Sequence, residues 1–145
     1  MVGLSSCSGT SNSTTLDSDD YDTKKERVEV LKKEIKSFSD FENAEFELFN
    51  VNGFSNSRAT VPGASSWDYK YAIKVKPSDV DKWTAGLLKI ETDSSNDNWA
   101  KKIVQERKND WKTETEPEFY SREEANVIII VFRSDGIIFK RVINN

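Results

Sequence analysis

The feature that most constrains the fold of this chain is an unbroken apolar run near its C-terminus. Residues 127–132 read Val-Ile-Ile-Ile-Val-Phe, so both faces of a strand built from them are apolar. Such a strand belongs at the centre of a sheet that is covered on both sides, because it aggregates when its edges are unpaired. Asp135-Gly136 is a favoured pair for a two-residue type I′ turn, and residues 137–143 return as the partner strand. This turn predicts that Phe132 lies opposite Phe139.

A second strand is predicted by strict alternation over Trp67–Lys76. One face carries Trp67, Tyr69, Tyr71, Ile73 and Val75, and the other carries Asp68, Lys70, Ala72, Lys74 and Lys76. One buried and one wet face is typical of an antiparallel sheet. Residues 46–51 resemble a further strand and are followed by Asn52-Gly53, a favoured hairpin pair. The polar segment 54–61 behind this pair is either an edge strand or a loop.

Three helices are expected between the strands. The first spans about 23–38 and opens with a capping box formed by Thr23 and Glu26. Its apolar stripe consists of Val28, Leu31, Ile35 and Phe38. The second begins near Pro77 with Ser78 as its cap, and the third covers about 97–109. The pattern predicts an α+β fold, with an antiparallel sheet of about four to five strands and a C-terminal hairpin. The first and third helices are expected on one face of the sheet.

The chain has 145 residues, which favours one domain. Residues 8–22 are small and polar, with too little apolar surface to offset the entropy of ordering. We therefore predict a disordered tail or linker over 1–22 and a single α+β domain over 23–145. No apolar run approaches the length of a membrane-spanning helix.

Composition argues against several classes of function. The chain has no histidine, which is the usual general base and the commonest metal ligand, and it has a single cysteine. Its net charge of −4, with acidic and basic residues intermixed, argues against nucleic acid as a partner. The spacing of Glu114, Glu116 and Glu118 is that of a solvated loop. We predict no enzymatic activity, no catalytic residues, no metal and no cofactor.

The single cysteine lies in the sequence Leu4-Ser5-Ser6-Cys7, which resembles a bacterial lipobox and is followed by a polar spacer. The resemblance to bacterial lipoproteins implies cleavage before Cys7 and lipidation of that residue. It implies a cell-envelope protein facing the periplasm, attached to the membrane only through its lipid anchor. Ser8 after the cysteine implies sorting to the outer membrane of a Gram-negative envelope. The globular part resembles no family.

Two interpretations of function remain open at this point. In the first, the chain is a non-enzymatic, envelope-tethered lipoprotein that binds another protein. In the second, it is a soluble intracellular interaction domain, similar to an antidote or immunity protein or to a phage accessory protein. Both need a binding surface, and Trp and Tyr are over-represented at interface hot spots. On residue type we choose as binding candidates Trp67, Tyr69, Trp111, Phe119 and Tyr120. The partner, the strand order and the oligomeric state are left open by the sequence.

Overall fold

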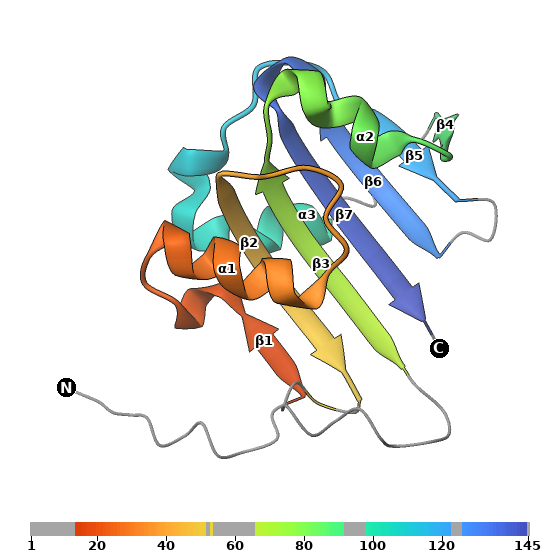
Figure 1. Cartoon of the computed structure of the whole chain (residues 1–145). Coiled ribbons are helices and arrows are strands. Elements are labelled where there is room, and N and C mark those ends of the chain that lie inside the picture. The colour runs from red at the N-terminus through yellow and green to blue at the C-terminus, as the bar shows by residue number, and fades with distance from the viewer. Residues whose placement is uncertain (1–13, 52, 54–65, 92–97, 123–125, 145) are drawn as a thin grey trace.

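A computed structural model describes residues 14–51, 53, 66–91, 98–122 and 126–144. The described part contains a seven-stranded antiparallel sheet with the order β1-β2-β3-β7-β6-β5-β4 (Figure 1). Its strands are β1 (Thr15–Asp17), β2 (Asn43–Asn50), β3 (Trp67–Lys74), β4 (Leu88–Ile90), β5 (Glu118–Ser121), β6 (Val127–Phe132) and β7 (Ile137–Asn144). The α+β class and the antiparallel sheet are confirmed. The expected number of four to five strands is wrong.

The additional strands are short. β1 and β4 form the two edges of the sheet and have three residues each. A segment of this length is too short to show a period of two in the sequence. β1 also corrects the predicted tail, because Thr15–Asp17 pairs with β2 and Ser18 behind it is buried. The ordered domain therefore begins before residue 23, whereas Cys7 lies outside the described residues.

The first helix, α1 (Lys24–Glu34), has the predicted capping box. The backbone N–H of Glu26 donates to Thr23 Oγ1 at 3.1 Å, and the N–H of Thr23 donates to Glu26 Oε1 at 3.3 Å. The helix ends at Glu34 instead of residue 38, because Ile35 takes an extended conformation. This early end leaves part of the sheet uncovered.

The second and third helices differ from their predicted forms. A 3-10 turn, η4 (Pro77–Asp79), leads into α2 (Val80–Thr84), and no side-chain cap is made at either start, so the predicted role of Ser78 is wrong. α3 (Asn98–Ile103) is followed by η6 (Gln105–Trp111) in place of one helix. None of the helices among the described residues is long and apolar enough to cross a membrane.

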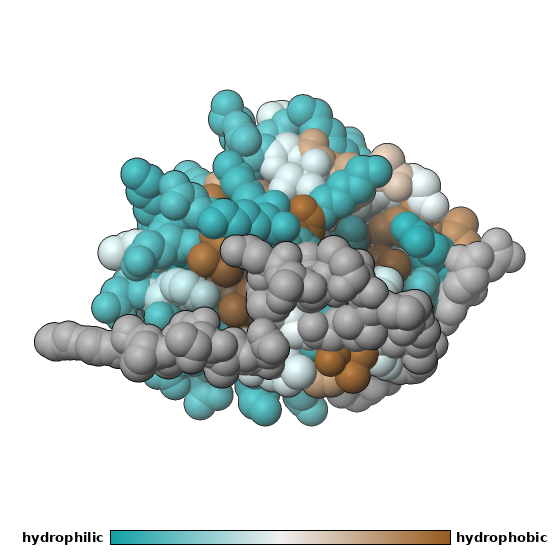
Figure 2. Space-filling view, turned by 60° about the horizontal axis from the view of Figure 1, so that its bottom comes forward, coloured by the Kyte–Doolittle hydropathy of each residue, from teal (hydrophilic) through white to brown (hydrophobic). Residues whose placement is uncertain are grey.

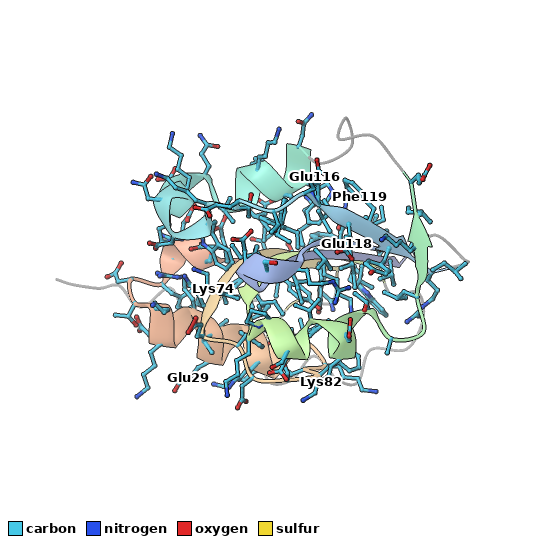
Figure 3. All side chains as sticks on the ribbon, turned by 90° about the horizontal axis from the view of Figure 1, so that it is seen from above. Glu29, Lys74, Lys82, Glu116, Glu118 and Phe119 are labelled. Carbon is cyan, nitrogen blue, oxygen red and sulfur yellow. The ribbon has the colours of Figure 1, made fainter. Side chains whose placement is uncertain are left out.

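The helices lie in two layers, one on each side of the sheet. Figures 1 and 3 show α1 and α2 on one face and α3 on the other. The prediction that the first and third helices share a face is therefore wrong. Ala72, which the alternation placed on a wet face, is fully buried because α3 covers that part of the sheet. The core under α1 and α2 includes Leu31, Phe46, Leu48, Tyr71, Ile73, Val80, Trp83, Ile129 and Ile138.

The C-terminal hairpin occupies the centre of the sheet, as predicted, with β6 between β5 and β7. Its turn is longer than the predicted type I′ turn. The 3-10 turn η7 (Arg133–Asp135) leads to Gly136 at φ +67°, so Phe132 lies opposite Ile137 and not Phe139. A shift of two residues keeps every side chain on its predicted face. Gly136 is required here, because a Cβ atom would lie 2.1 Å from the carbonyl oxygen of Val75.

The sequence left the pairing of β2 open, and the structure identifies β3 as a partner over the whole strand. β2 pairs along its whole length with β3, from Asn43 opposite Lys74 to Asn50 opposite Trp67. Asn52 and the segment 54–61, the alternative edge strand or loop, lie outside the described residues. The long β2–β3 pairing brings Asn50 beside the aromatic start of β3.

Candidate functional site

A groove of about 260 Å³ lies between the end of α1 and the start of β3. We call it the aromatic groove. It is lined by Glu34, Ile35, Lys36, Asn50, Trp67, Tyr69, Tyr71 and Val142. Figure 2, in which the bottom of the view in Figure 1 comes forward, shows hydrophobic residues among hydrophilic ones on this face of the molecule. The lining of the groove likewise includes apolar side chains, such as Ile35 and Val142, beside charged ones. The groove therefore combines an apolar floor with a polar rim.

The alternation of β3 builds the floor of the aromatic groove. Trp67, Tyr69 and Tyr71 are two residues apart and so point to the same face of the strand. Val142 of β7 lies opposite Tyr69, and Asn50 of β2 lies opposite Trp67. Because α1 ends before it covers this corner, Trp67 and Tyr69 are only half-buried. Their rings are 6.4 Å apart and tilted by 46°.

Some polar groups of the aromatic groove form hydrogen bonds within the described part of the chain, and others do not. Asn50 Nδ2 donates to the Tyr69 hydroxyl at 3.1 Å. Tyr71 is only 2% exposed, and burial raises the pKa of its hydroxyl. Within the described part of the chain, neither this hydroxyl nor the indole N–H of Trp67 forms a hydrogen bond. The groove thus offers two donors at its floor.

Of the predicted binding residues, the structure brings Trp67 and Tyr69 together in the aromatic groove. Trp111 is buried in the core on the opposite face, where its indole N–H donates to Glu45 Oε2 at 3.4 Å. Phe119 also packs against that core, and Tyr120 packs against the core under α1. The five residues do not form one surface, because alternate positions of β5 face opposite sides of the sheet.

Sequence reasoning missed the other residues of the groove. Tyr71 was predicted as a core residue, and this is confirmed, but it also lines the groove. Asn50, Val142 and Ile35 join it through strand pairing and through the end of α1. The sequence signal for them is weak, since strand partners are not readable from local alternation.

A buried carboxylate is the centre of a second cluster, which we call the Glu45 network. It contains Ser18, Asp19, Arg27, Glu45, Arg107 and Trp111. Glu45 is 0% exposed and accepts from Ser18 Oγ at 2.7 Å and from Arg107 Nη2 at 2.6 Å. Hydrogen bonding to Glu45 is the main reason that the pKa of Arg107 is raised. Each charge here has an opposite partner, as burial requires, so the network is structural.

A surface cluster, the Arg133 network, lies at the β5 side of the sheet. Arg133 contacts Asp81 and Glu118 at 2.6 and 3.0 Å, and Tyr120 donates to Glu118 at 2.8 Å. Hydrogen bonding from Arg133 lowers the pKa of Glu118. Figure 3 shows Glu116, Glu118 and Phe119 close together on this side of the molecule. Among the described residues no group of three potential metal ligands is present.

Lys140 is a cation without an ion pair in the described part of the chain. Its Nζ lies 5.2 Å from the ring centre of Phe38 and 5.9 Å from that of Trp83. Burial, with a smaller effect from Arg122, lowers the pKa of Lys140 to about 8. The aromatic rings partly replace the missing carboxylate.

A wider pocket of about 530 Å³ lies at the other end of β3, beside Lys74 and the loop that follows α1. Its lining charges have both signs and are largely satisfied within the fold. Asp79 pairs with Lys82 at 3.0 Å, and Asp135 accepts from the backbone N–H groups of Glu114 and Thr115. Polar groups that already have partners make this pocket a weaker candidate than the aromatic groove.

No protein-family model, no curated protein and no solved structure matches this chain. A functional proposal therefore depends on the geometry of the aromatic groove and on the N-terminal sequence.

Proposed function

We propose that this chain is a non-enzymatic protein of the bacterial envelope that binds another protein through the aromatic groove. It is anchored by a lipid at Cys7 and faces the periplasm. The observation that supports binding most is the half-buried pair Trp67 and Tyr69 on the floor of the groove. The resemblance of Leu4-Ser5-Ser6-Cys7 to a lipobox supports the location.

Half-buried aromatic residues on a sheet suit protein recognition for two physical reasons. Trp and Tyr have large contact areas but few rotatable bonds, so little conformational entropy is lost on binding. Trp67 and Tyr69 also belong to β3, which is hydrogen-bonded along its length to β2 and β7. The floor of the groove is therefore preorganised, which lowers the free-energy cost of association.

The soluble intracellular interaction domain remains the second candidate, since the same groove serves a cytoplasmic partner equally well. The two proposals differ in the covalent state of Cys7. The intact mass of the protein, extracted in detergent from its source cells, separates them. We expect a chain that begins at an acylated Cys7. An unmodified chain that retains residues 1–6 would contradict the lipoprotein proposal and favour the intracellular one.

The binding surface is tested by Trp67→Ala. We expect at least a thirtyfold loss of partner binding, the effect of losing a strong hot spot, with a melting temperature within a few degrees of the wild type. The measurement is the yield of the cross-linked partner complex in source cells, together with a thermal melt of the purified variant.

Trp99→Ala is the matched control, because Trp99 packs against the core on the opposite face of the sheet. We expect it to lower the melting temperature and leave the cross-linked complex intact. A large drop in melting temperature for Trp67→Ala would assign Trp67 to the core instead. Equal cross-linking in wild type and Trp67→Ala would contradict binding through the groove.

A further inference from the structure

Lys140 carries a positive charge that the fold does not neutralise. It lies on β7 opposite Tyr71 and Ile129, whose side chains belong to the core under α1 and α2, so its own side chain points to the same face. Lys140 is half-buried, and it forms no ion pair with any described residue. Charges that are removed from water normally have an opposite partner. The missing partner of Lys140 therefore suggests that an external group supplies it.

A second ammonium group lies beside the first. Lys36 Nζ is 5.6 Å from the ring centre of Phe38, and Lys140 Nζ is 5.2 Å from the same ring centre. Lys36 is exposed and likewise forms no ion pair within the described ranges of the chain. The Phe38 side chain is 41% exposed. We call Lys36, Phe38 and Lys140 the Phe38 surface, an exposed aromatic ring with two unneutralised cations beside it.

The acidic side chains that flank Phe38 along the chain have other partners. Glu34, which also lines the aromatic groove, has an interaction partner, and Asp40 lies 3.7 Å from Lys32. The charge that perturbs the pKa of Lys140 is that of Arg122, which is also positive. The Phe38 surface is therefore locally positive, although the net charge of the chain is −4.

The fold keeps Lys140 at a cost to its stability. Burial disfavours the ammonium form, which lowers the pKa of Lys140 to about 8. The nearby aromatic rings offset only part of this penalty. An apolar side chain of similar length would fill the same space without it. Residues that reduce the stability of a fold are frequently those that its function needs, so this cost favours a role of Lys140 in binding.

The Phe38 surface is continuous with the aromatic groove. Lys36 lines the groove, and so does Val142, which is two positions from Lys140 on the same face of β7. A partner that contacts Trp67 and Tyr69 on the floor of the groove therefore has both ammonium groups within reach.

Carboxylates are the groups that complement this surface. A carboxylate at Lys140 accepts a charge-assisted hydrogen bond in a partly desolvated place, where such bonds are strong. Side chains two positions apart in an extended segment lie on one side of it and are separated by roughly 7 Å. Both ammonium groups lie within 5.6 Å of one ring centre. Two glutamates with one residue between them can therefore reach both.

We propose that the Phe38 surface and the adjoining aromatic groove bind an acidic segment of the partner protein, with one carboxylate at Lys140 and a second at Lys36. The exposed ring of Phe38 packs against the aliphatic part of this segment. The inference rests on the proposed function, because it names the chemistry of the partner that the groove binds.

The test uses the full chain, immobilised, and two random libraries of ten-residue peptides. One library has glutamate at two fixed positions with one position between them, and the other has the uncharged glutamine there. We expect the chain to retain the glutamate library at least about tenfold better, the effect of one charge-assisted hydrogen bond. This preference opposes the net charge of the chain and should weaken as salt is added. Individual retained peptides are then measured by fluorescence polarisation.

Lys140→Met is the decisive variant, because a binding role and a structural role predict opposite results. We expect about tenfold weaker binding of the retained glutamate peptides, with an unchanged or higher melting temperature. Lys102→Met is the matched control, since Lys102 is exposed on α3, which covers the opposite face of the sheet (Figure 1). It removes the same charge from the molecule, so peptide binding should not change.

Three outcomes would overturn the inference. Equal retention of both libraries would mean that the surface does not select carboxylates. Equal losses of peptide binding in Lys140→Met and Lys102→Met would mean that only the net charge matters. A lower melting temperature of Lys140→Met with unchanged peptide binding would make Lys140 a structural residue.

The partner complex in source cells separates this inference from the proposed function. We expect the yield of the cross-linked complex to fall in Lys140→Met as it does in Trp67→Ala, and to be unchanged in Lys102→Met. A complex that depends on Trp67 but not on Lys140 would overturn the inference and leave the proposed function intact. A complex that depends on neither residue would contradict both proposals.

Discussion

The Glu45 network and the Arg133 network each place an arginine between two carboxylates, but they differ in burial. Arg107 contacts Glu45, which is fully buried, and its own side chain is 24% exposed. Arg133 contacts Asp81, whose side chain is 81% exposed, and the half-buried Glu118, and its own side chain is 38% exposed. Solvent therefore screens the Arg133–Asp81 ion pair more strongly than the contact of Arg107 with Glu45, whose side chain is 1% exposed. The same ion-pair chemistry should therefore have different effects on stability.

The two networks also differ in what they connect. The Glu45 network joins the N-terminal segment, α1, β2 and η6, and Arg107 reaches Asp19 across 88 positions of sequence. The Arg133 network joins β5, α2 and the β6–β7 turn at the surface. Figure 1 shows α1 beside β1 and β2 at one edge of the sheet. The buried network is thus the one that attaches the N-terminal segment to the domain.

The largest expected effect is that of Arg107→Met. This variant removes the main partner of the buried Glu45 carboxylate, and breaking a buried pair costs about 3 kcal/mol. The measurement is the free energy of unfolding from urea denaturation. Arg133→Met is the matched control, since the substitution is identical and the site is exposed. Equal losses for the two variants would refute the distinction between the networks.

Lys140→Met tests a partly buried cation that has aromatic rings in place of a carboxylate. Its lowered pKa means that the charged form is disfavoured in the folded state, so we expect a gain of about 1–2 kcal/mol in stability at pH 7.

The pH dependence provides a second readout for Lys140. Between pH 8 and 10.5 the folded state holds fewer protons than the unfolded state, so the wild type should gain stability as pH rises through this window. Lys140→Met should lack this rise. If Lys140→Met is less stable than the wild type and its stability has the same pH dependence, the aromatic rings compensate fully for the burial of the Lys140 ammonium group.

The smallest expected effect is that of Arg133→Met, with a loss below about 1 kcal/mol. The lowered pKa of Glu118 adds a pH dependence of known sign. A carboxyl whose pKa is lowered on folding stabilises the fold above its ordinary pKa of 4.5, and this contribution is lost as pH falls through the lowered pKa.

Acid titration of the unfolding free energy checks this prediction for Arg133. The loss of stability below pH 4.5 should be smaller in Arg133→Met than in the wild type. If both proteins lose the same unfolding free energy below pH 4.5, Arg133 does not stabilise the Glu118 carboxylate.

Local patterns predicted a large part of the fold. The apolar run 127–132 was placed correctly at the centre of the sheet, and the capping box at Thr23 marked the start of α1 correctly. Both signals lie within a few residues of sequence. The edges β1 and β4 were missed, because strands of three residues carry no measurable alternation.

The candidate site was predictable only in part. Trp67 and Tyr69 were chosen by residue type and do share the groove, whereas Trp111 is the hydrogen-bonded core partner of Glu45. Glu45 lies in a strand and Arg107 was expected on a helix, and neither has a local feature that marks it as buried. The pairing of Arg107 with Glu45 could be recognised only once the positions of η6 and β2 in space were known.

By itself, the sequence determined the α+β class, the antiparallel sheet and the faces on which the side chains of β3 lie, since these follow from periods of two and 3.6 residues. Only the tertiary structure decided that α1 and α3 cover opposite faces, that Glu45 is buried with Arg107, and that α1 ends early enough to leave the aromatic groove open. The physical reason is the range of the interactions involved. Periodicity depends on neighbours along the chain, whereas burial depends on which distant segments exclude water together.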